Sequence, residues 1–247
     1  ASGGGCMKTL SVIIPCYNEA ATLREIVAAV EALASDGLAL EILIVDDCST
    51  DASLTVAEEL AAAASSVRVL RHAVNQGKGA ALKTGFLAAA GDFVCVQDAD
   101  LEYDPQDFLK MLRPLLSGEA DVVFGSRYLQ RHERRVLRWW HSTMNKFLTL
   151  CSNVASDMAL TDMETCYKMF TREVMREIAP QLRERRFGFE PECVAAVARG
   201  MRQKGWRVCE CAVRYRPRTF SDGKKIGWRD GVRALWCIVR YNLLARG

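Results

Sequence analysis

The stretch VCVQDADLE, residues 94–102, joins a short apolar run to three acidic residues at alternating positions. Short apolar runs rich in β-branched residues are typical of strands that are buried on both faces of a parallel sheet. Asp98, Asp100 and Glu102 would point the same way if the extended backbone continued through them. The stretch therefore predicts a buried strand that ends in a group of carboxylates.

The remainder of the first 127 residues alternates strand and helix patterns with short connections. Further strands are expected at residues 10–15, 40–45, 67–70 and 121–125, and helices at residues 20–34, 51–64, 78–90 and 105–116. Ser49 or Asp51 is expected to cap the second helix. Continuous apolar strands that alternate with helices indicate an α/β fold, with a mostly parallel sheet covered by helices on both faces.

The pattern changes after residue 127. Helices are expected at residues 133–154, 171–179, 190–202 and 228–244, and strands at residues 166–170 and 206–215. We find no linker or internal repeat, so residues 7–127 and 128–247 are expected to be two parts of a single domain. Residues 1–6 (ASGGGC) look like a cloning remnant and are left out of the fold prediction.

Composition and charge narrow the class of protein. The 247 residues are 50% hydrophobic and 26% charged, which excludes disordered and collagen-like chains. Residues 1–125 hold 8 Lys and Arg against 18 Asp and Glu, a net −10, and residues 126–247 hold 25 against 12, a net +13. A basic half is typical of polyanion binding, although ordinary solvated faces also explain such a split.

The ten cysteines and the apolar runs bear on the compartment. The sequence has no Cys-x-x-Cys pair, no run of 18 apolar residues and no charged-then-apolar leader. We therefore expect a cytoplasmic protein with reduced thiols.

Three carboxylates without a nearby His or Cys favour a hard metal ion. Asp98, Asp100 and Glu102 suit Mg²⁺ or Mn²⁺ holding a diphosphate. The alternative is that these acids cap the helix that follows Pro105.

Other polar residues follow the predicted strands, where ligands bind in open α/β sheets. Tyr17 and Glu19 could contact a base and a ribose, and Asp46 and Asp47 could accept hydrogen bonds from a nucleoside. The run NQGKG, residues 75–79, lacks the spacing of a phosphate-binding loop, so its glycines are better explained by packing or a turn. Lys78 within it is kept as a candidate donor-binding residue.

Five motifs together resemble the family 2 glycosyltransferases, which have the Rossmann-like GT-A fold. In chain order they are IPCYNE at residues 14–19, VDD at 45–47, NQGKG at 75–79, DADL at 98–101 and GSR at 125–127. The set is most similar to the dolichyl- and polyprenyl-phosphate sugar synthases, over nearly all of residues 8–225. The Gln-x-x-Arg-Trp signature of processive polymerases is absent, which favours a single transfer.

The resemblance implies inverting, metal-dependent transfer of one sugar from a GDP-mannose or UDP-glucose type of donor to a polyprenyl or dolichyl phosphate. It implies that residues 7–127 bind the nucleotide sugar and that residues 128–247 bind the acceptor. The donor residues it implies are Pro15, Tyr17, Glu19 and Asp47 around the nucleoside, Asp98 near the nucleotide, and Asp100 and Glu102 on the metal. Arg138 with Ser142, and Arg218 with Lys224, match the acceptor half of the family in part.

The chemistry of the departing group agrees with these assignments. A nucleoside diphosphate gains negative charge as it leaves, which a metal held by Asp100 and nearby cations would stabilise. The candidate cations are Arg127, Arg138, Arg218 and Lys224. A phosphate acceptor needs no general base, whereas a hydroxyl acceptor does, and Asp162 is the best candidate for it. A helix or turn cap is the alternative role of Asp162.

Departures from the family pattern leave the acceptor open. Glu102 stands where the family often has Gln, Gly223 precedes Lys224 where the family has Ser, and residues 161–168 replace the usual Asp-x-x-Ser-Gly-Phe segment. A sugar, lipid or protein hydroxyl is the alternative acceptor. The alternative function that is not enzymatic is that of a catalytically inactive protein that binds a nucleotide sugar.

Two basic and aromatic segments bear on partners. On a helix at residues 228–244, Arg229, Arg233 and Arg240 would lie beside an apolar face, and a second cluster of Arg134, Arg135 and Arg138 adjoins Trp139 and Trp140. This is typical of a helix on an anionic membrane surface, although packing of an amphipathic helix on the core explains it equally. We expect peripheral attachment at the inner face of a membrane, alone or through a membrane partner protein. A homo-oligomer stays open, and nucleic acid is not an expected partner.

Overall fold

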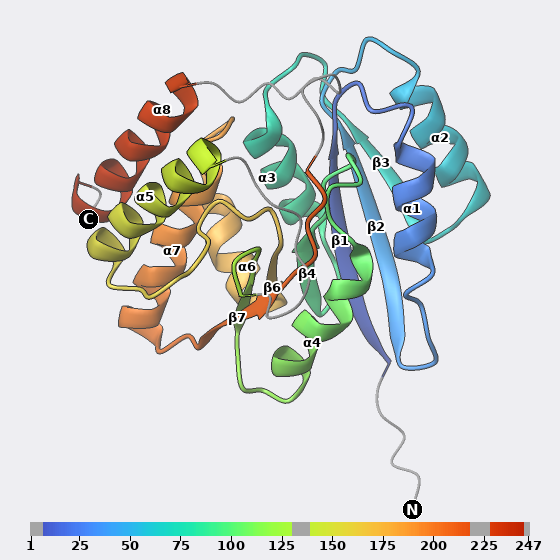
Figure 1. Ribbon diagram of the computed structural model, residues 1–247. Helices are drawn as coiled ribbons and strands as arrows, with labels where there is room; N and C mark the ends of the chain where they lie inside the picture. The colour runs from blue at the N-terminus through green and yellow to red at the C-terminus, as the bar shows by residue number, and fades with distance from the viewer. Residues whose placement is uncertain (1–6, 130–138, 218–227, 245–247) are drawn as a thin grey trace, which may run out of the picture.

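The computed structural model describes residues 7–129, 139–217 and 228–244 (Figure 1). The fold is α/β and is built on a seven-stranded sheet with the strand order β3-β2-β1-β4-β6-β5-β7. The strands are β1 (Lys8–Cys16), β2 (Leu38–Asp46), β3 (Val67–Arg71), β4 (Phe93–Val96), β5 (Val122–Ser126), β6 (Lys168–Thr171) and β7 (Val208–Ala212).

The sheet is mostly parallel, as the sequence predicts. β1 pairs in parallel with β2 and β4, β2 with β3, and β5 with β7. β6 is the exception, because it inserts between β4 and β5 and runs antiparallel to both. An apolar run reveals a strand but carries no information on its direction.

Helices cover the sheet and form a group beside it (Figure 1). Those of the first half are α1 (Leu23–Glu31), α2 (Ser53–Ala63), α3 (Lys78–Ala88), the 3₁₀ turn η1 (Pro105–Asp107) and α4 (Phe108–Leu116). Those of the second half are α5 (Trp139–Ser156), α6 (Arg172–Ile178), η2 (Ala179–Gln181), α7 (Phe189–Lys204), α8 (Trp228–Val239) and the π-helical turn η4 (Arg240–Leu244). In this second half α5, α7 and α8 contact one another and lie side by side.

The sequence predicts which elements exist better than it predicts their ends. The strand expected at residues 206–215 is confined to β7, and the helix expected at 228–244 changes to a π-helical turn after Val239. α2 begins at Ser53, and Asp51 accepts a hydrogen bond from the Ser53 main chain while Ser49 accepts one from Asn18. Of the expected cap pair, only Asp51 therefore contacts the start of α2.

Strand direction decides where the polar residues meet. β1, β2, β4 and β5 all point the same way, so the segments that follow them emerge at one edge of the sheet. The segment before β6 reaches the same edge, because β6 runs in the opposite direction. The polar motifs of both halves are thus gathered at the carboxyl edge, where ligands of open α/β sheets bind.

The described part of the chain bears on two further expectations. Its nine cysteines are all free thiols. None of its helices is long and apolar enough to cross a membrane.

Candidate active site

The segments after β1 and β2 interlock at the carboxyl edge. Asn18, which has a φ of 58°, accepts a hydrogen bond of 2.8 Å from the Thr50 main chain, and the Glu19 main chain donates one of 2.8 Å to Ser53. These bonds bring Pro15, Tyr17, Glu19 and Asp46 of the predicted nucleoside group into one region. Tyr17 is 41% exposed, which leaves its ring accessible for stacking.

Asp47 has an internal role that the sequence does not predict. Its buried carboxylate accepts hydrogen bonds from the Gln76 and Gly77 main chains, at 2.9 and 2.7 Å, and lies 2.7 Å from Nδ1 of His72. Nε2 of His72 in turn lies 2.9 Å from Thr84 Oγ1. Asp47 therefore fixes the loop that precedes α3, and His72 is a site residue that sequence reasoning missed.

The glycines of residues 75–79 are packing glycines, as expected. A Cβ on Gly79 would lie 2.3 Å from the Glu184 carbonyl oxygen, and one on Gly77 would lie 2.5 Å from that of Arg185. Because Gly77 and Gly79 have no Cβ, the segment before α7 can lie directly on the start of α3. There the Ala80 main chain donates a hydrogen bond of 3.1 Å to the Arg185 carbonyl oxygen.

Lys78 bridges this loop and β4. Its Nζ lies 2.7 Å from Asp98 Oδ1 and 4.0 Å from Glu190 Oε1 on α7. Burial disfavours the charged ammonium, but Asp98 and the acidic groups around it outweigh burial and raise the pKa of Lys78 well above its usual value. The predicted donor residues Lys78 and Asp98 therefore form a fixed ion pair.

The expectation that Asp98, Asp100 and Glu102 share one face is wrong. β4 ends at Val96, and the chain then turns, with Leu101 at a φ of 58°. Asp100 accepts a hydrogen bond from the Glu102 main chain at 3.1 Å, and the Glu102 carboxylate accepts one from the Tyr215 hydroxyl at 2.9 Å. Within residues 7–129, 139–217 and 228–244, no three His, Cys, Asp or Glu side chains converge as a metal site.

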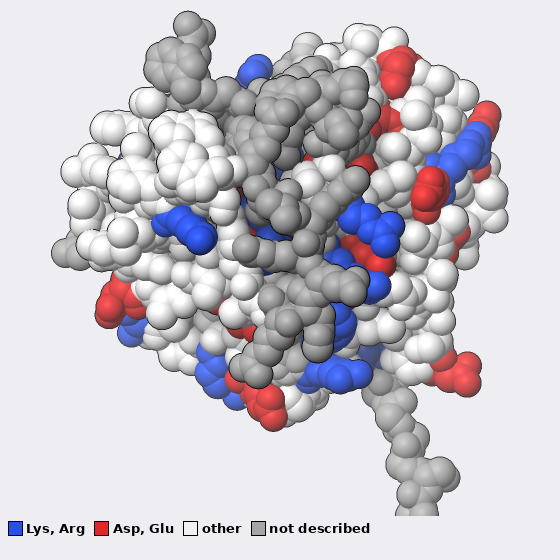
Figure 2. Space-filling view, viewed as in Figure 1, with Lys and Arg blue, Asp and Glu red and all other residues white. Residues whose placement is uncertain are grey.

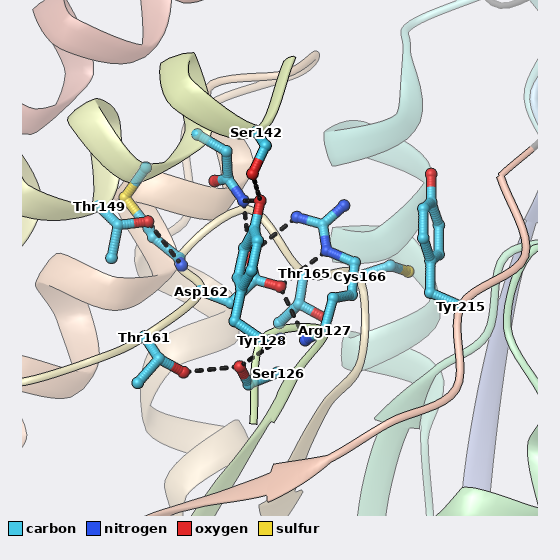
Figure 3. Close-up of polar contacts among 12 residues, drawn as sticks. Ser126, Arg127, Tyr128, Ser142, Thr149, Thr161, Asp162, Thr165, Cys166 and Tyr215 are labelled. Atoms are coloured by element: carbon cyan, nitrogen blue, oxygen red, sulfur yellow. Dashed lines mark hydrogen bonds and ion pairs between the residues drawn. The ribbon is translucent and has the colours of Figure 1, made fainter. Parts of the chain in front are cut away.

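Arg127 and Asp162 form the centre of a cluster of polar side chains between the segment after β5 and the segment before β6 (Figure 3). Nε of Arg127 donates to Oδ2 of Asp162, and Nη2 donates to Oδ1, both at 2.7 Å, while the Arg127 main chain adds a bond of 3.0 Å to Oδ2. Asp162 is fully buried and Arg127 is 14% exposed. Burial would raise the pKa of Asp162, but Arg127 outweighs it and lowers that pKa.

Two aromatic residues and α5 surround this pair. The guanidinium carbon of Arg127 lies 5.1 Å from the ring centre of Tyr215, a cation–π contact. Asn145 of α5 donates to Asp162 Oδ1 at 2.9 Å and to the Tyr128 hydroxyl at 3.1 Å. Ser142, predicted from the sequence, donates to the same hydroxyl at 3.4 Å.

Glu164 is a second group that the sequence did not single out for its chemistry. Its Oε1 is buried and has no hydrogen-bond partner among the described residues. Burial, followed by the charge of Glu190, raises the pKa of Glu164 from 4.5 to about 8. Its surroundings therefore favour the neutral acid over the carboxylate.

Three predicted cations, Arg138, Arg218 and Lys224, lie outside the described residues. Arg229 belongs to α8, but its side chain is outside the description as well. Of the residues predicted for charge stabilisation or for the acceptor, the structure thus describes the surroundings of Arg127, Ser142 and Asp162.

The predicted cationic stripe of α8 is used in part for internal packing. Arg233 donates to both oxygens of Glu184, with Nη2–O distances of 2.9 and 2.8 Å, and the Tyr241 hydroxyl adds a bond of 2.9 Å. The outer face of α8 and the adjoining α5 are rich in exposed apolar side chains. They are Trp139, Trp140, Met144, Phe147, Leu150 and Val154 on α5, and Val232, Trp236, Val239, Leu243 and Leu244 on α8 and η4. Uncharged atoms dominate this side of the molecule in Figure 2.

Known proteins resemble the chain in sequence and in fold. A dolichol-phosphate mannosyltransferase of Pyrococcus furiosus is 38% identical over 121 residues, which are 49% of this chain and 34% of that protein. A dolichyl-phosphate beta-glucosyltransferase, ALG5C, of Trichomonas vaginalis is 29% identical over 194 residues, 73% of this chain and 57% of that protein. The chain thus spans about a third to somewhat over half of these relatives' lengths.

A solved structure shares the fold. The glucosyl-3-phosphoglycerate synthase of Mycobacterium tuberculosis, crystallised with Mn²⁺, UDP and phosphoglyceric acid, superposes with a TM-score of 0.69 at 21% identity. The match covers 96% of this chain and 79% of that one. It confirms the predicted GT-A type of fold.

The model of the glycosyl transferase family 2 matches residues 11–179, more than half of the chain and all five motifs. The chain belongs to the glycosyl transferase family 2.

Proposed function

We propose that this chain transfers one sugar, with inversion, from a nucleotide sugar to a polyprenyl phosphate, with Mg²⁺ or Mn²⁺. The state of Asp162 carries this proposal. A hydroxyl acceptor needs a base, but Asp162 accepts three hydrogen bonds from Arg127 and one from Asn145, and its pKa is lowered. Burial raises the pKa of Glu164, which favours its neutral form, and a neutral carboxyl does not accept a proton as a base. An acceptor that is already an anion needs neither.

The donor half supports binding of a nucleoside diphosphate. Tyr17 offers an exposed ring for the base, and Pro15, Glu19 and Asp46 are the further residues proposed to contact the nucleoside. Asp47 acts here indirectly, because its oxygens hold the loop of residues 75–77. Lys78 sits in an ion pair with Asp98 at the end of β4, where the diphosphate is proposed to lie.

The residues after β4 fit a hard divalent cation. They supply carboxylate oxygens, and Mg²⁺ is usually held by one or two carboxylates together with substrate phosphates, so a three-residue cluster is not needed. Asp100 is the proposed main ligand, with Asp98 and Glu102 as further candidates. The metal would neutralise negative charge on the departing diphosphate.

Of the four predicted cations, Arg127 is the one whose surroundings lie within the described residues. We propose that its guanidinium, fixed by Asp162 and stacked on Tyr215, orients the acceptor phosphate. A phosphate oxygen then attacks the anomeric carbon from the side opposite the nucleoside diphosphate. The new C–O bond forms as the bond between the anomeric carbon and the diphosphate breaks. The electron pair of the broken bond leaves with the diphosphate. Arg138, Arg218 and Lys224 remain proposed partners in charge stabilisation.

The exposed apolar side chains of α5, α8 and η4 named above are called the α5–α8 surface. This surface supports attachment to an anionic bilayer. Trp and Tyr are typical of membrane–water interfaces, and α5 contains no Asp or Glu. Lys146 on α5 and Arg240 on η4 supply cations. A polyprenyl phosphate resides in such a bilayer, so docking would bring enzyme and acceptor together.

The test is transfer of labelled sugar. Incubation with labelled GDP-mannose or UDP-glucose, Mn²⁺ and undecaprenyl phosphate should move label into the organic phase. Label that remains in nucleotide sugar with every donor and metal would favour the catalytically inactive alternative. In that case thermal stabilisation by the donors would still show binding.

A further inference from the structure

The amide of Asn145 is an unexplained feature beside the Arg127–Asp162 pair. The side chain is 8% exposed, and its amide nitrogen donates hydrogen bonds to Asp162 and to Tyr128. Its Oδ1 is buried without a hydrogen-bond partner in the part of the chain that the structure describes. A buried acceptor without a donor is unfavourable, so stability alone does not explain an amide at this position.

The orientation of the amide follows from its neighbours. Turning it by half a revolution would place Oδ1 against the Asp162 carboxylate, where two acceptors would repel each other. Asn145 is therefore a double donor that joins the segment after β5, at Tyr128, to the segment before β6, at Asp162.

A fourth donor completes the Asp162 carboxylate. Oδ2 accepts from the Arg127 main chain and Nε, and Oδ1 accepts from Nη2 and from Asn145. Two oxygens with four lone-pair sites are thus filled, which leaves the carboxylate one orientation. Because the Arg127 guanidinium is planar and paired through both nitrogens, its direction follows that of Asp162.

We propose that Asn145 is a positioning residue of the transfer reaction, which fixes the Asp162 carboxylate and thereby the direction in which Arg127 faces the acceptor. This inference rests on the proposed function. It adds a second role for α5. The outer face of this helix carries exposed apolar side chains, and Asn145 on its inner face fixes the direction of the Arg127 guanidinium through Asp162.

The chain offers a matched control on the same helix. Asn153 donates to the Leu160 carbonyl at 2.8 Å and accepts from the Leu160 main chain at 3.1 Å. Both ends of its amide are thus used to hold the backbone, without contact to Arg127. Asn153→Leu reports what loss of a structural amide from α5 does.

The first comparison separates activity from stability. Asn145→Leu should lower kcat with undecaprenyl phosphate about 10- to 100-fold, because displacing a positioning group such as Arg127 by roughly 1 Å has an effect of this size. The KM for the nucleotide sugar and the melting temperature should stay near the wild-type values. Asn153→Leu should lower the melting temperature while kcat below that temperature stays within about twofold.

The second comparison uses pH. In Asn145→Asp a protonated carboxyl can donate to Asp162 as the amide does, whereas an ionised one repels it. The charged and titratable groups around this position are Asp162, Arg127, Tyr128, Lys146 and Glu164. The activity of the variant relative to wild type should therefore rise about tenfold as the pH falls from about 8 to about 6.

An NMR measurement reports the pairing without turnover. The Arg127 Nε–H resonance, assigned by its loss in Arg127→Lys, should shift and exchange faster with water in Asn145→Leu but not in Asn153→Leu. Unchanged Nε–H behaviour, or equal kcat in the two leucine variants, would overturn the inference. A wild type that transfers no sugar to lipid phosphate would defeat the proposed acceptor instead, and the NMR result would still decide the role of Asn145.

Discussion

Arg127 and Asp162 are 35 residues apart in the chain and are joined by two parallel hydrogen bonds of 2.7 Å. This pairing indicates the roles of both residues. Arg127 keeps a fixed cation at the carboxyl edge of the sheet, and Asp162 is engaged as its partner rather than held ready to accept a proton.

Acid should remove the stabilisation that Asp162 provides. Its pKa is lowered from 3.8, so the carboxylate stabilises the fold at every pH above that value and loses the effect as pH falls through the folded-state pKa. Asp162→Asn should therefore reduce the free energy of unfolding at pH 7 by about 3 kcal/mol, since it leaves Arg127 without its charge partner. The difference from wild type should shrink below about pH 4, as urea unfolding at several pH values would show. An equal difference at pH 7 and pH 3 would contradict the pairing.

Glu164 should have the opposite pH dependence. Its raised pKa means that the folded chain holds a proton that the unfolded chain releases, so stability falls as pH rises from about 4.5 to about 8 and is level above that. Glu164→Gln should raise the melting temperature at pH 8 and change it little at pH 4.5. Scanning calorimetry at the two pH values checks this. A variant less stable than wild type at pH 8 would show that Glu164 is ionised and paired.

Asp100→Ala should abolish metal-dependent donor turnover. Loss of a metal ligand removes several kcal/mol of transition-state stabilisation, roughly a thousandfold in rate. Asp98→Ala should weaken donor binding, because it also breaks the ion pair with Lys78. Asp104→Ala is the control, since Asp104 caps η1 and pairs with Arg214 in the same region. Near-normal activity of Asp100→Ala over a Mn²⁺ titration would remove the metal assignment.

Gly79→Ala should disturb the contact between α3 and the segment before α7. The added Cβ would lie 2.3 Å from a main-chain oxygen of Glu184, so the backbone must shift, at a cost of about 1–3 kcal/mol. We expect a lower melting temperature and a weaker affinity for nucleotide sugar. Gly37→Ala, whose Cβ would meet nothing within 4 Å, is the matched control. Equal effects of the two substitutions would show that this packing is unimportant.

Charges placed on the α5–α8 surface should weaken binding to vesicles. Leu150 and Val154 are 60% and 79% exposed, so changing both to Glu should leave the fold intact. Sedimentation with vesicles that contain anionic lipid should show roughly tenfold weaker binding. Leu116→Glu is the control on α4, where the side chain is 54% exposed. Wild type that stays in the supernatant would contradict the proposed attachment.

The sequence predicts the alternation of strands and helices because apolar periodicity is a local signal. Runs of a few residues predict β1, β2 and β4, the helices between them, and the edge of the sheet at which Tyr17, Asp46 and Asp98 lie. The glycine-rich run lacks the spacing of a phosphate loop, which favours packing or a turn, and the close contacts of Gly77 and Gly79 confirm packing.

The remainder depends on contacts between distant segments. No local pattern shows that β6 inserts antiparallel between β4 and β5. Nor does one show that the Asp47 carboxylate accepts hydrogen bonds from the Gln76 and Gly77 main chains, or that Asp162 pairs with Arg127. The three-carboxylate face was predicted by extending β4 too far. The left-handed backbone at Leu101 belongs to a turn that the alternation of acids does not reveal.

The most direct test of the central claim offers two acceptors that differ only in the phosphate. Undecaprenyl phosphate and undecaprenol are supplied in equal amounts with labelled GDP-mannose or UDP-glucose and Mn²⁺, and the glycolipids are separated and counted. The account predicts labelled sugar on the phosphate alone, and loss of that product in Arg127→Ala. Sugar transferred to undecaprenol, through a reaction that Asp162→Asn abolishes but Arg127→Ala does not, would contradict it.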